Sequence, residues 1–137
     1  MIESFNNHFK QICSNLNSKK KVFVLGLSGG LDSMTLLYLL KRFLENNNKF
    51  EIEIFPVIVD HNIRQGSSKE ACQVQNLSQQ LGFKTTIKKI HCKIPSGNIQ
   101  DWARKKRRDI LCESTYELSA NLLLAHHFDD QAETLFM

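Results

Sequence analysis

The chain has 137 residues, which corresponds to one domain or less. Hydrophobic residues make up 42% and charged residues 23%, an ordinary balance for a packed protein that argues against disorder. Six Gly and two Pro are too few for a collagen-like or linker-like chain. The net charge of +4 is mildly basic, so it permits a polyanionic partner without requiring one.

No segment of the sequence resembles a membrane anchor or an export signal. The longest apolar runs, VFVLGL and LLYLL, are far shorter than the ~20 residues of a membrane span. The start, MIESFNNHF, has no basic stretch followed by an apolar core. The four cysteines never approach CxxC spacing, which indicates reduced thiols and gives no support to a zinc ribbon. We therefore expect a cytoplasmic protein with no membrane partner.

The first half of the chain alternates between helical and strand patterns. A helix is expected over residues 3–16, where apolar side chains recur at helical spacing. The run VFVLGL at 22–27 is typical of a strand buried on both faces. Asp32 and Ser33 then open a long helical pattern, and EIEIFPVIVD at 51–60 predicts a second strand.

The alternation continues in the second half. Ser67 or Ser68 is expected to cap a helix that Gly82 ends. A third strand is expected over 83–90, and a helix over 98–118. The fourth strand is expected at NLLLA, followed by a helix that begins at Asp129 or Asp130. This order predicts an α/β fold, a parallel doubly wound sheet with helices on both faces.

The last residues, AETLFM, lie inside an apparent helix that has no Gly, Asn or basic closing turn. We therefore expect the chain to be a fragment that is truncated at its C-terminus, within its last helix.

The segment GLSGGLDS at 26–33 is the strongest functional signal. Ligands of open parallel sheets bind beyond the carboxyl ends of the strands, and this segment joins such an end to a helix N-terminus. Backbone N–H groups that converge there form an anion site. Gly29 and Gly30 would let the backbone approach a phosphate closely, and Ser28 and Ser33 could each donate a hydroxyl.

The familiar phosphate-loop motifs do not fit this segment. A Walker A loop would need Gly and Lys where Leu31 and Asp32 stand, and a dinucleotide fingerprint would need Gly at Ser28 and Leu31. An acid beside a phosphate is repulsive unless a cation intervenes or the acid orients a nucleophile. Asp32 therefore indicates Mg²⁺-nucleotide chemistry. The structural alternative is a tight turn capped by Asp32.

Other polar residues have a functional and a structural interpretation. Asp60 and His61, at the end of the second strand, would lie beside an adenine, a ribose or a target base, or would form a solvated loop in which Asp60 caps. Arg64 could pair with a phosphate or be merely solvated. Arg104 and Arg107 share a helix face with Arg108, and a solvated basic face is the alternative to phosphate binding.

The segment around AHHFDDQAE resembles a metal cluster in composition. Adjacent residues at a strand end cannot easily all face one ion, so a zinc site is not expected. On the expected helix, Asp129 and Glu133 share a face at i, i+4, and Asp130 and Glu133 are neighbours at i, i+3. These acids could hold Mg²⁺ or orient an attacking amine, or an Asp could cap the helix.

The string SGGLDS after a hydrophobic strand resembles the PP-loop of the ATP-pyrophosphatase (N-type) superfamily, whose fold is adenine nucleotide alpha hydrolase-like. The segments VDHNIRQGSSKEA, NIQDWARKKRRDIL and LLLAHHFDDQAET narrow the resemblance to the tRNA(Ile)-lysidine synthetase family, over about residues 20–137. Two positions depart from the family pattern. Arg108 stands where an aromatic residue is usual, and an acid common before the A-R pair is replaced by Gln100 or displaced to Asp101.

The resemblance implies that residues 1–137 are an incomplete N-terminal PP-loop ATP-binding catalytic domain. It implies ATP-dependent ligation of free L-lysine to C2 of the wobble cytidine of a CAU-anticodon tRNA(Ile). The cytidine would first be adenylated, and AMP and pyrophosphate would be released. ATP and Mg²⁺ would be the cofactors. The alternatives are another PP-loop tRNA enzyme, such as a cytidine thiolase, against which the absence of CxxC counts, and a non-catalytic nucleotide-binding module.

The resemblance also assigns expected roles to residues of this chain. Mg²⁺ would be held by Asp32 and Asp130. The expected catalytic residues are Asp32, Glu133, His127 and Arg107. The expected nucleotide-binding residues are Ser28, Gly29, Gly30, Leu31, Asp32, Ser33, Asp60, His61 and Arg104.

Overall fold

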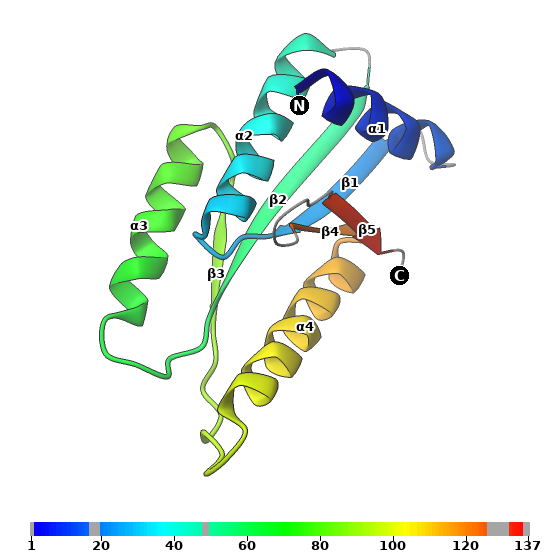
Figure 1. Ribbon diagram of the computed structural model, residues 1–137. Helices are drawn as coiled ribbons and strands as arrows, with labels where there is room; N and C mark the ends of the chain where they lie inside the picture. The colour runs from blue at the N-terminus through cyan, green and yellow to red at the C-terminus, as the bar shows by residue number, and fades with distance from the viewer. Residues whose placement is uncertain (1, 17–19, 48–49, 126–131, 136–137) are drawn as a thin grey trace.

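The computed structural model describes residues 2–16, 20–47, 50–125 and 132–135, with the backbone alone described at Lys20 and at 132–135. The helices and strands follow one another along the chain as Figure 1 shows. They are α1 (Ile2–Asn15), β1 (Lys20–Gly26), α2 (Leu31–Asn46), β2 (Glu51–Asp60), α3 (Ser67–Gln80), β3 (Thr86–Lys89), α4 (Ile99–Glu117), β4 (Asn121–Ala125) and β5 (Ala132–Leu135).

The strands form a sheet in the order β3-β2-β1-β4-β5. The strands β1 to β4 are parallel, and β1 pairs with β2 from Lys20 opposite Glu51 to Gly26 opposite Val57. The parallel α/β sheet expected from the sequence is therefore confirmed. It has one addition, since β5 pairs antiparallel to β4 at the edge.

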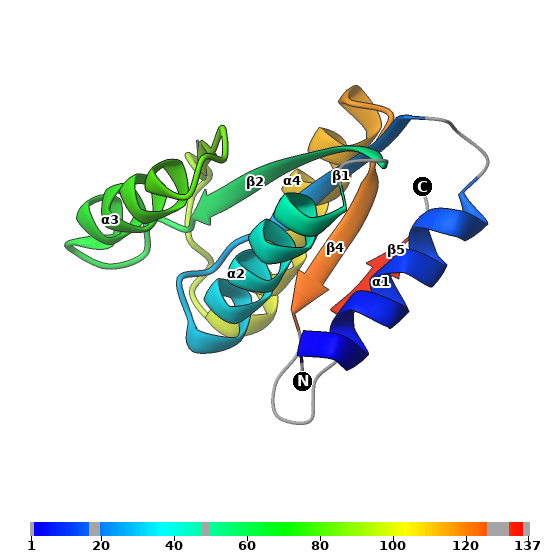
Figure 2. The ribbon, with the colours of Figure 1, turned by 90° about the horizontal axis from the view of Figure 1, so that it is seen from above.

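Helices cover both faces of the sheet, as Figure 2 shows for α2 and α4. The chain first moves outward from β1 through β2 to β3, and α2 and α3 lie on one face. It then returns past β1 to β4, which places α4 on the opposite face because parallel crossovers are right-handed. The reversal occurs at β1, so the carboxyl end of β1 lies where both layers of helices meet.

Alternate residues of the strands supply the two cores. Phe23 and Leu25 of β1 face the α1–α3 layer, where they join Phe9. Val24, between them, faces α4 and packs in a second cluster with Leu111. Successive side chains of a strand point to opposite faces of the sheet. A parallel sheet covered by helices on both faces therefore needs apolar residues at successive positions.

Most elements begin and end within two residues of their expected positions, but three expectations are wrong. The third strand starts at Thr86, because Gly82 turns the chain at φ +95° and Thr85 bonds back to Ser78 of α3. Neither Ser67 nor Ser68 caps α3. Its N-cap is Gly66, at φ +91°.

The third correction concerns the end of the chain. Residues Ala132–Leu135 form strand β5, where a helix from Asp129 or Asp130 was expected. The outer edge of β4 offers unpaired backbone groups that this segment satisfies, and four residues of mixed polarity carry no decisive period. Asp129 and Asp130 themselves lie outside the described residues. Glu133 itself lies in a strand and not in the expected helix.

Two long-range contacts hold the helices of the first face together. The amine of Lys41 on α2 donates to the carbonyl oxygen of Leu81, the C-cap of α3, at 2.8 Å. The ring of Phe9 on α1 lies 5.3 Å from that of Phe23 and 4.9 Å, edge-on, from that of Phe43 on α2. In the part of the chain that the structure describes, no helix has the length and apolarity to cross a bilayer.

Replacing Phe9 with Ala tests how α1 docks. Phe9 is 1% exposed, and the cavity left in the aromatic cluster should lower the free energy of unfolding by about 3–5 kcal/mol. Urea denaturation measures this loss. The half-buried Phe5 is the matched control, and Phe5→Ala should cost clearly less. Equal losses would contradict the docking described here.

Candidate functional site

The turn between β1 and α2 is held by its own hydroxyl groups. Ser33 Oγ accepts from the backbone N–H of Ser28 and donates to the carbonyl oxygen of Gly30, both at 3.2 Å. Ser28 Oγ accepts from the Gly30 N–H at 3.2 Å and lies 3.0 Å from Ser33 Oγ. Because Ser33 has one proton, Ser28 donates within this pair. Both hydroxyls thus donate inside the turn, and their donation to a phosphate stays a prediction.

Gly29 is required by its contact with α3. Its φ of +84° favours glycine, and a Cβ there would lie 2.7 Å from Cγ2 of Val74. Gly30 has an ordinary φ of −71°, and a Cβ there would meet only Ser28 Oγ, at 3.4 Å. Gly29 therefore allows the turn to pack on α3, whereas Gly30 leaves the backbone open to a close ligand.

The N-terminus of α2 opens directly from this turn. Its N-cap is Gly30, which has no side chain that could cap the helix. Asp32 is not the N-cap residue, because it is the second residue of the helix, where it is half-buried. Leu31 precedes it and is 83% exposed. A helix N-terminus whose N-cap is glycine, reached by a glycine turn, suits an anion.

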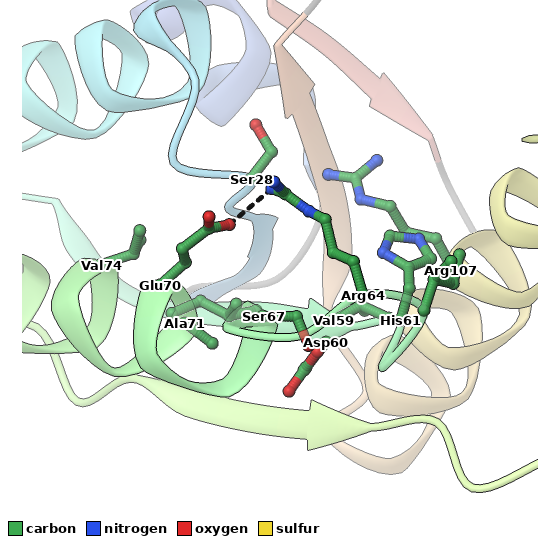
Figure 3. A pocket seen from close by; sticks show the side chains of 12 residues that line it. Ser28, Val59, Asp60, His61, Arg64, Ser67, Glu70, Ala71, Val74 and Arg107 are labelled. Atoms are coloured by element: carbon green, nitrogen blue, oxygen red, sulfur yellow. Dashed lines mark hydrogen bonds and ion pairs between the residues drawn. The ribbon is translucent and has the colours of Figure 1, made fainter.

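A cavity of about 300 Å³ adjoins the turn, at the carboxyl ends of β1 and β2 (Figure 3). Apolar side chains of β2, α3 and the loop between them line part of its wall, and polar side chains from five segments line the rest. The lining residues are Ser28, Ile58, Val59, Asp60, His61, Ile63, Arg64, Ser67, Glu70, Ala71, Val74 and Arg107. An apolar wall with a few polar groups is typical of a small-molecule site.

Asp60 lines this cavity but also shapes the chain around it. Its carboxylate accepts from the backbone N–H of Asn62 at 2.9 Å and from Ser68 Oγ at 3.1 Å. Burial raises the pKa of Asp60, but hydrogen bonds from Ser67, Asn62 and Ser68 and the charge of Lys89 together hold it below its ordinary value. The carboxylate is therefore ionised, and it fixes the turn between β2 and α3.

His61 and Arg107 lie side by side and connect β2 to α4 (Figure 3). Burial lowers the pKa of His61, as does the charge of Arg107, against a hydrogen bond to the backbone of Ala103 and the charge of Asp60. The imidazole is consequently neutral at pH 7. Burial also lowers the pKa of Arg107, whose guanidinium remains charged.

Gly26 lets α4 come this close to the end of β1. A Cβ at Gly26 would lie 2.8 Å from Leu111 Cδ1 and 3.1 Å from Arg107 Nη2. The guanidinium of Arg107 therefore packs against bare backbone at the mouth of the parallel sheet, where it also lines the cavity.

The structure separates the basic residues of α4. Arg107 is half-buried and lines the cavity, whereas Arg104 and Arg108 are exposed and do not line it. Lys105 is exposed and Lys106 is half-buried. Of the three arginines, Arg107 alone joins the loop residues at this cavity, and phosphate binding by Arg104 stays a prediction.

The structure does not describe the side chains of three expected site residues. His127 and Asp130 lie outside the described residues. Glu133 lies in β5, where its backbone is opposite Leu124 of β4, and its side chain is not described. Within the described ranges, no group of three or more His, Cys, Asp or Glu residues is placed to hold a metal ion. Asp32 is the one expected magnesium ligand that the structure describes.

Sequence reasoning missed the contribution of α3. Val74 supports the turn, and Glu70 and Ser67 line the cavity. Ser67 was interpreted as a helix cap and Val74 was not singled out. A weak signal was present, since Val74 is a β-branched residue in the polar helix SSKEACQVQNLSQQ.

Comparison with known proteins gives one family match. A family model described as a PP-loop domain matches residues 1–137. The solved structure of the U34-tRNA thiolase NcsA from Methanococcus maripaludis with its [4Fe-4S] cluster has a similar fold, with a TM-score of 0.68 and 18% identity. The match covers 89% of this chain and 46% of that chain.

Curated tRNA(Ile)-lysidine synthases are similar in sequence. Those of Rickettsia africae (strain ESF-5) and Rickettsia rickettsii (strain Sheila Smith) are 35% identical over 134 residues, and that of Rickettsia felis is 34% identical. The matches cover 97% of this chain but 27%, 27% and 30% of these relatives. The chain thus spans less than a third of the length of the curated relatives it matches.

Gly29→Ala should destabilise the protein for two separable reasons. A residue with a side chain loses about 1–2 kcal/mol of folding free energy in this left-handed backbone conformation. The steric contact of its Cβ with Val74 costs about 1–3 kcal/mol more. Gly82→Ala is the matched control, because Gly82 has a φ of +95° and open space around it. Thermal unfolding should show the larger loss for Gly29→Ala, and Val74→Ala should partly restore that variant. Equal losses for both glycines would disprove the steric contact.

The lowered pKa of His61 makes stability depend on pH. The unfolded chain titrates this histidine near pH 6.5, whereas the folded chain binds the proton only at lower pH. Stability should therefore be greatest above about pH 7 and fall as the pH drops below 6.5 toward the folded pKa. Urea unfolding between pH 5 and 8 should show a weaker dependence for His61→Gln. The same change at the exposed His91 serves as the control.

Proposed function

Because this chain belongs to the PP-loop family, we propose that it binds ATP and adenylates a cytidine of tRNA. In finer detail, we propose that it serves the ligation of L-lysine to C2 of the wobble cytidine of a CAU-anticodon tRNA(Ile). The 35% identity to curated tRNA(Ile)-lysidine synthases supports this choice of reaction. The curated relatives named for this whole reaction are more than three times as long as the matched segment.

The observation that carries the proposal is the junction of the glycine turn with the cavity. Ser28 belongs to both, so a ligand could lay its phosphates on the N-terminus of α2 while its base enters the cavity. The apolar side chains Ile58, Val59 and Val74 suit the faces of a purine ring. Arg107 supplies positive charge at the same mouth.

Adenylation comes first in this reaction. The C2 oxygen of the cytidine attacks the α-phosphorus of ATP, and the bond to the β-phosphate breaks as pyrophosphate leaves. Negative charge grows on the departing pyrophosphate, so donors that are already in place lower the barrier. The backbone N–H groups of the first turn of α2 and the guanidinium of Arg107 would supply such donors.

Ligation follows when the lysine amine attacks C2 and AMP leaves. An amine with an unperturbed pKa of ~10.4 must first lose a proton, and Asp32 is our first candidate to assist, with Glu133 and His127 as further candidates. A carboxylate next to nucleotide oxygens also suits Mg²⁺, which Asp32 would hold and which would neutralise phosphate charge. Asp130 stays a predicted second ligand.

Thiolation is the alternative to be distinguished. The structural neighbour is a thiolase, but at 18% identity it supports the fold alone. The sequence has no CxxC pair, which counts against that chemistry. Cys13 is buried, with its pKa raised by burial to about 11 despite the charge of Lys21, while Cys72 and Cys92 are exposed.

The test is release of AMP and pyrophosphate from ATP, with lysine and tRNA each omitted in turn. Pyrophosphate release should require tRNA, and AMP release should require lysine as well. Asp32→Asn should slow turnover at least about 100-fold, as expected when a positioned acid–base group is lost. Asp109→Asn, on the exposed side of α4, is the matched control and should leave the rates unchanged.

Turnover without tRNA, or with a sulfur donor in place of lysine, would contradict the proposed reaction. ATP binding, measured by calorimetry on the 137-residue chain, is a separate arm. Failure to bind ATP there would contradict the assignment of the turn and the cavity to the nucleotide.

A further inference from the structure

An ion pair stands at the mouth of the cavity and is not used by the reaction described above. Arg64 Nη2 lies 2.6 Å from Oε2 of Glu70, and both residues line the cavity. In Figure 3 the Arg64 side chain extends from the turn after β2 toward Glu70 and the side where Ser28 lies. Its side chain is 71% exposed and that of Glu70 is 54% exposed.

The fold fixes the backbone of this pair but leaves the side chains free to exchange partners. Asn62 and Gly66 both have positive φ, which turns the chain back over the start of α3. The carbonyl oxygen of Arg64 accepts from the N–H of Ser67 at 3.3 Å. The base of the Arg64 side chain is therefore held while its guanidinium lies in solvent at the cavity rim.

The remaining charges of the cavity make this pair unusual. Asp60 is held by Asn62 and Ser68, and Arg107 is half-buried against α4. Glu70 is thus an acid at the rim of a site proposed to take a triphosphate, where it repels the ligand. Its presence is explained if it acts on Arg64.

We propose that Arg64 binds a phosphate of the nucleotide, and that Glu70 competes with that phosphate for the guanidinium. The inference rests on the proposed function. An exposed ion pair is weak, so exchange of Glu70 for a phosphate costs little. A phosphate offers the guanidinium two-pronged hydrogen bonds and a greater charge. When pyrophosphate is the product, Glu70 recaptures Arg64 and speeds its release.

The experiment measures binding of inorganic pyrophosphate and of ATP by calorimetry. Glu70→Gln should tighten binding of pyrophosphate about two- to fivefold, because the competitor for Arg64 is lost. Arg64→Gln should weaken it about fivefold or more. In the double variant the effect of Glu70→Gln should disappear, since there is no guanidinium left to release.

Glu45→Gln is the matched control. Glu45 pairs with Lys41 at 3.8 Å, has a side chain that is 60% exposed, and lies near the far end of α2 from the turn. The substitution removes the same charge, so it should leave binding unchanged. Thermal unfolding should show all four variants folded, because every substituted side chain is at least half exposed.

Three outcomes would overturn the inference. Glu70→Gln could leave pyrophosphate binding unchanged or weaken it. It could tighten binding equally when Arg64 is replaced, which would show charge repulsion alone. Loss of ATP and pyrophosphate binding in the unsubstituted chain would overturn both this inference and the proposed function. Either of the first two outcomes, with ATP binding retained, overturns the inference alone.

Discussion

The site depends on how closely the turn after β1 approaches α3. Gly29 lies against Val74, so the turn and the helix share a wall, and the hydroxyls of Ser28 and Ser33 hold the backbone in that position. A side chain at residue 29 would separate the two elements. The cavity would then lose the contact that makes the anion-binding backbone and the apolar slot continuous.

The titratable groups of the cavity are likewise held by contacts within the fold. Hydrogen bonds use both carboxylate oxygens of Asp60, and burial beside Arg107 keeps His61 neutral. Arg107 itself comes from the opposite face of the sheet. The polar groups nearest the apolar wall are thus occupied or uncharged, which leaves the arginines as the cations available to a ligand with several negative charges.

Much of this could be predicted from the sequence, because the relevant signals are local. The apolar runs and the helical spacing predicted the sheet, and the string SGGLDS predicted the position of the turn. The cap of α3 could not be predicted, because Gly66, Ser67 and Ser68 are all suitable N-cap residues. The hydrogen bond from Ser68 to Asp60, eight residues earlier in the chain, favours Gly66 as the N-cap. The role of Val74 depends on a crossover that no short segment encodes, and the edge pairing of β5 depends on the backbone groups that β4 leaves open.

The position of α4 has a mechanical consequence. One helix carries both the backbone group of Ala103 that bonds to His61 and the guanidinium that packs on Gly26. A slide of this helix by a single residue, a rise of about 1.5 Å, would displace the two together. Repacking around Leu111, on the side of the sheet remote from α3, would therefore be transmitted to the cavity as one correlated shift, without any change in a residue that touches the ligand.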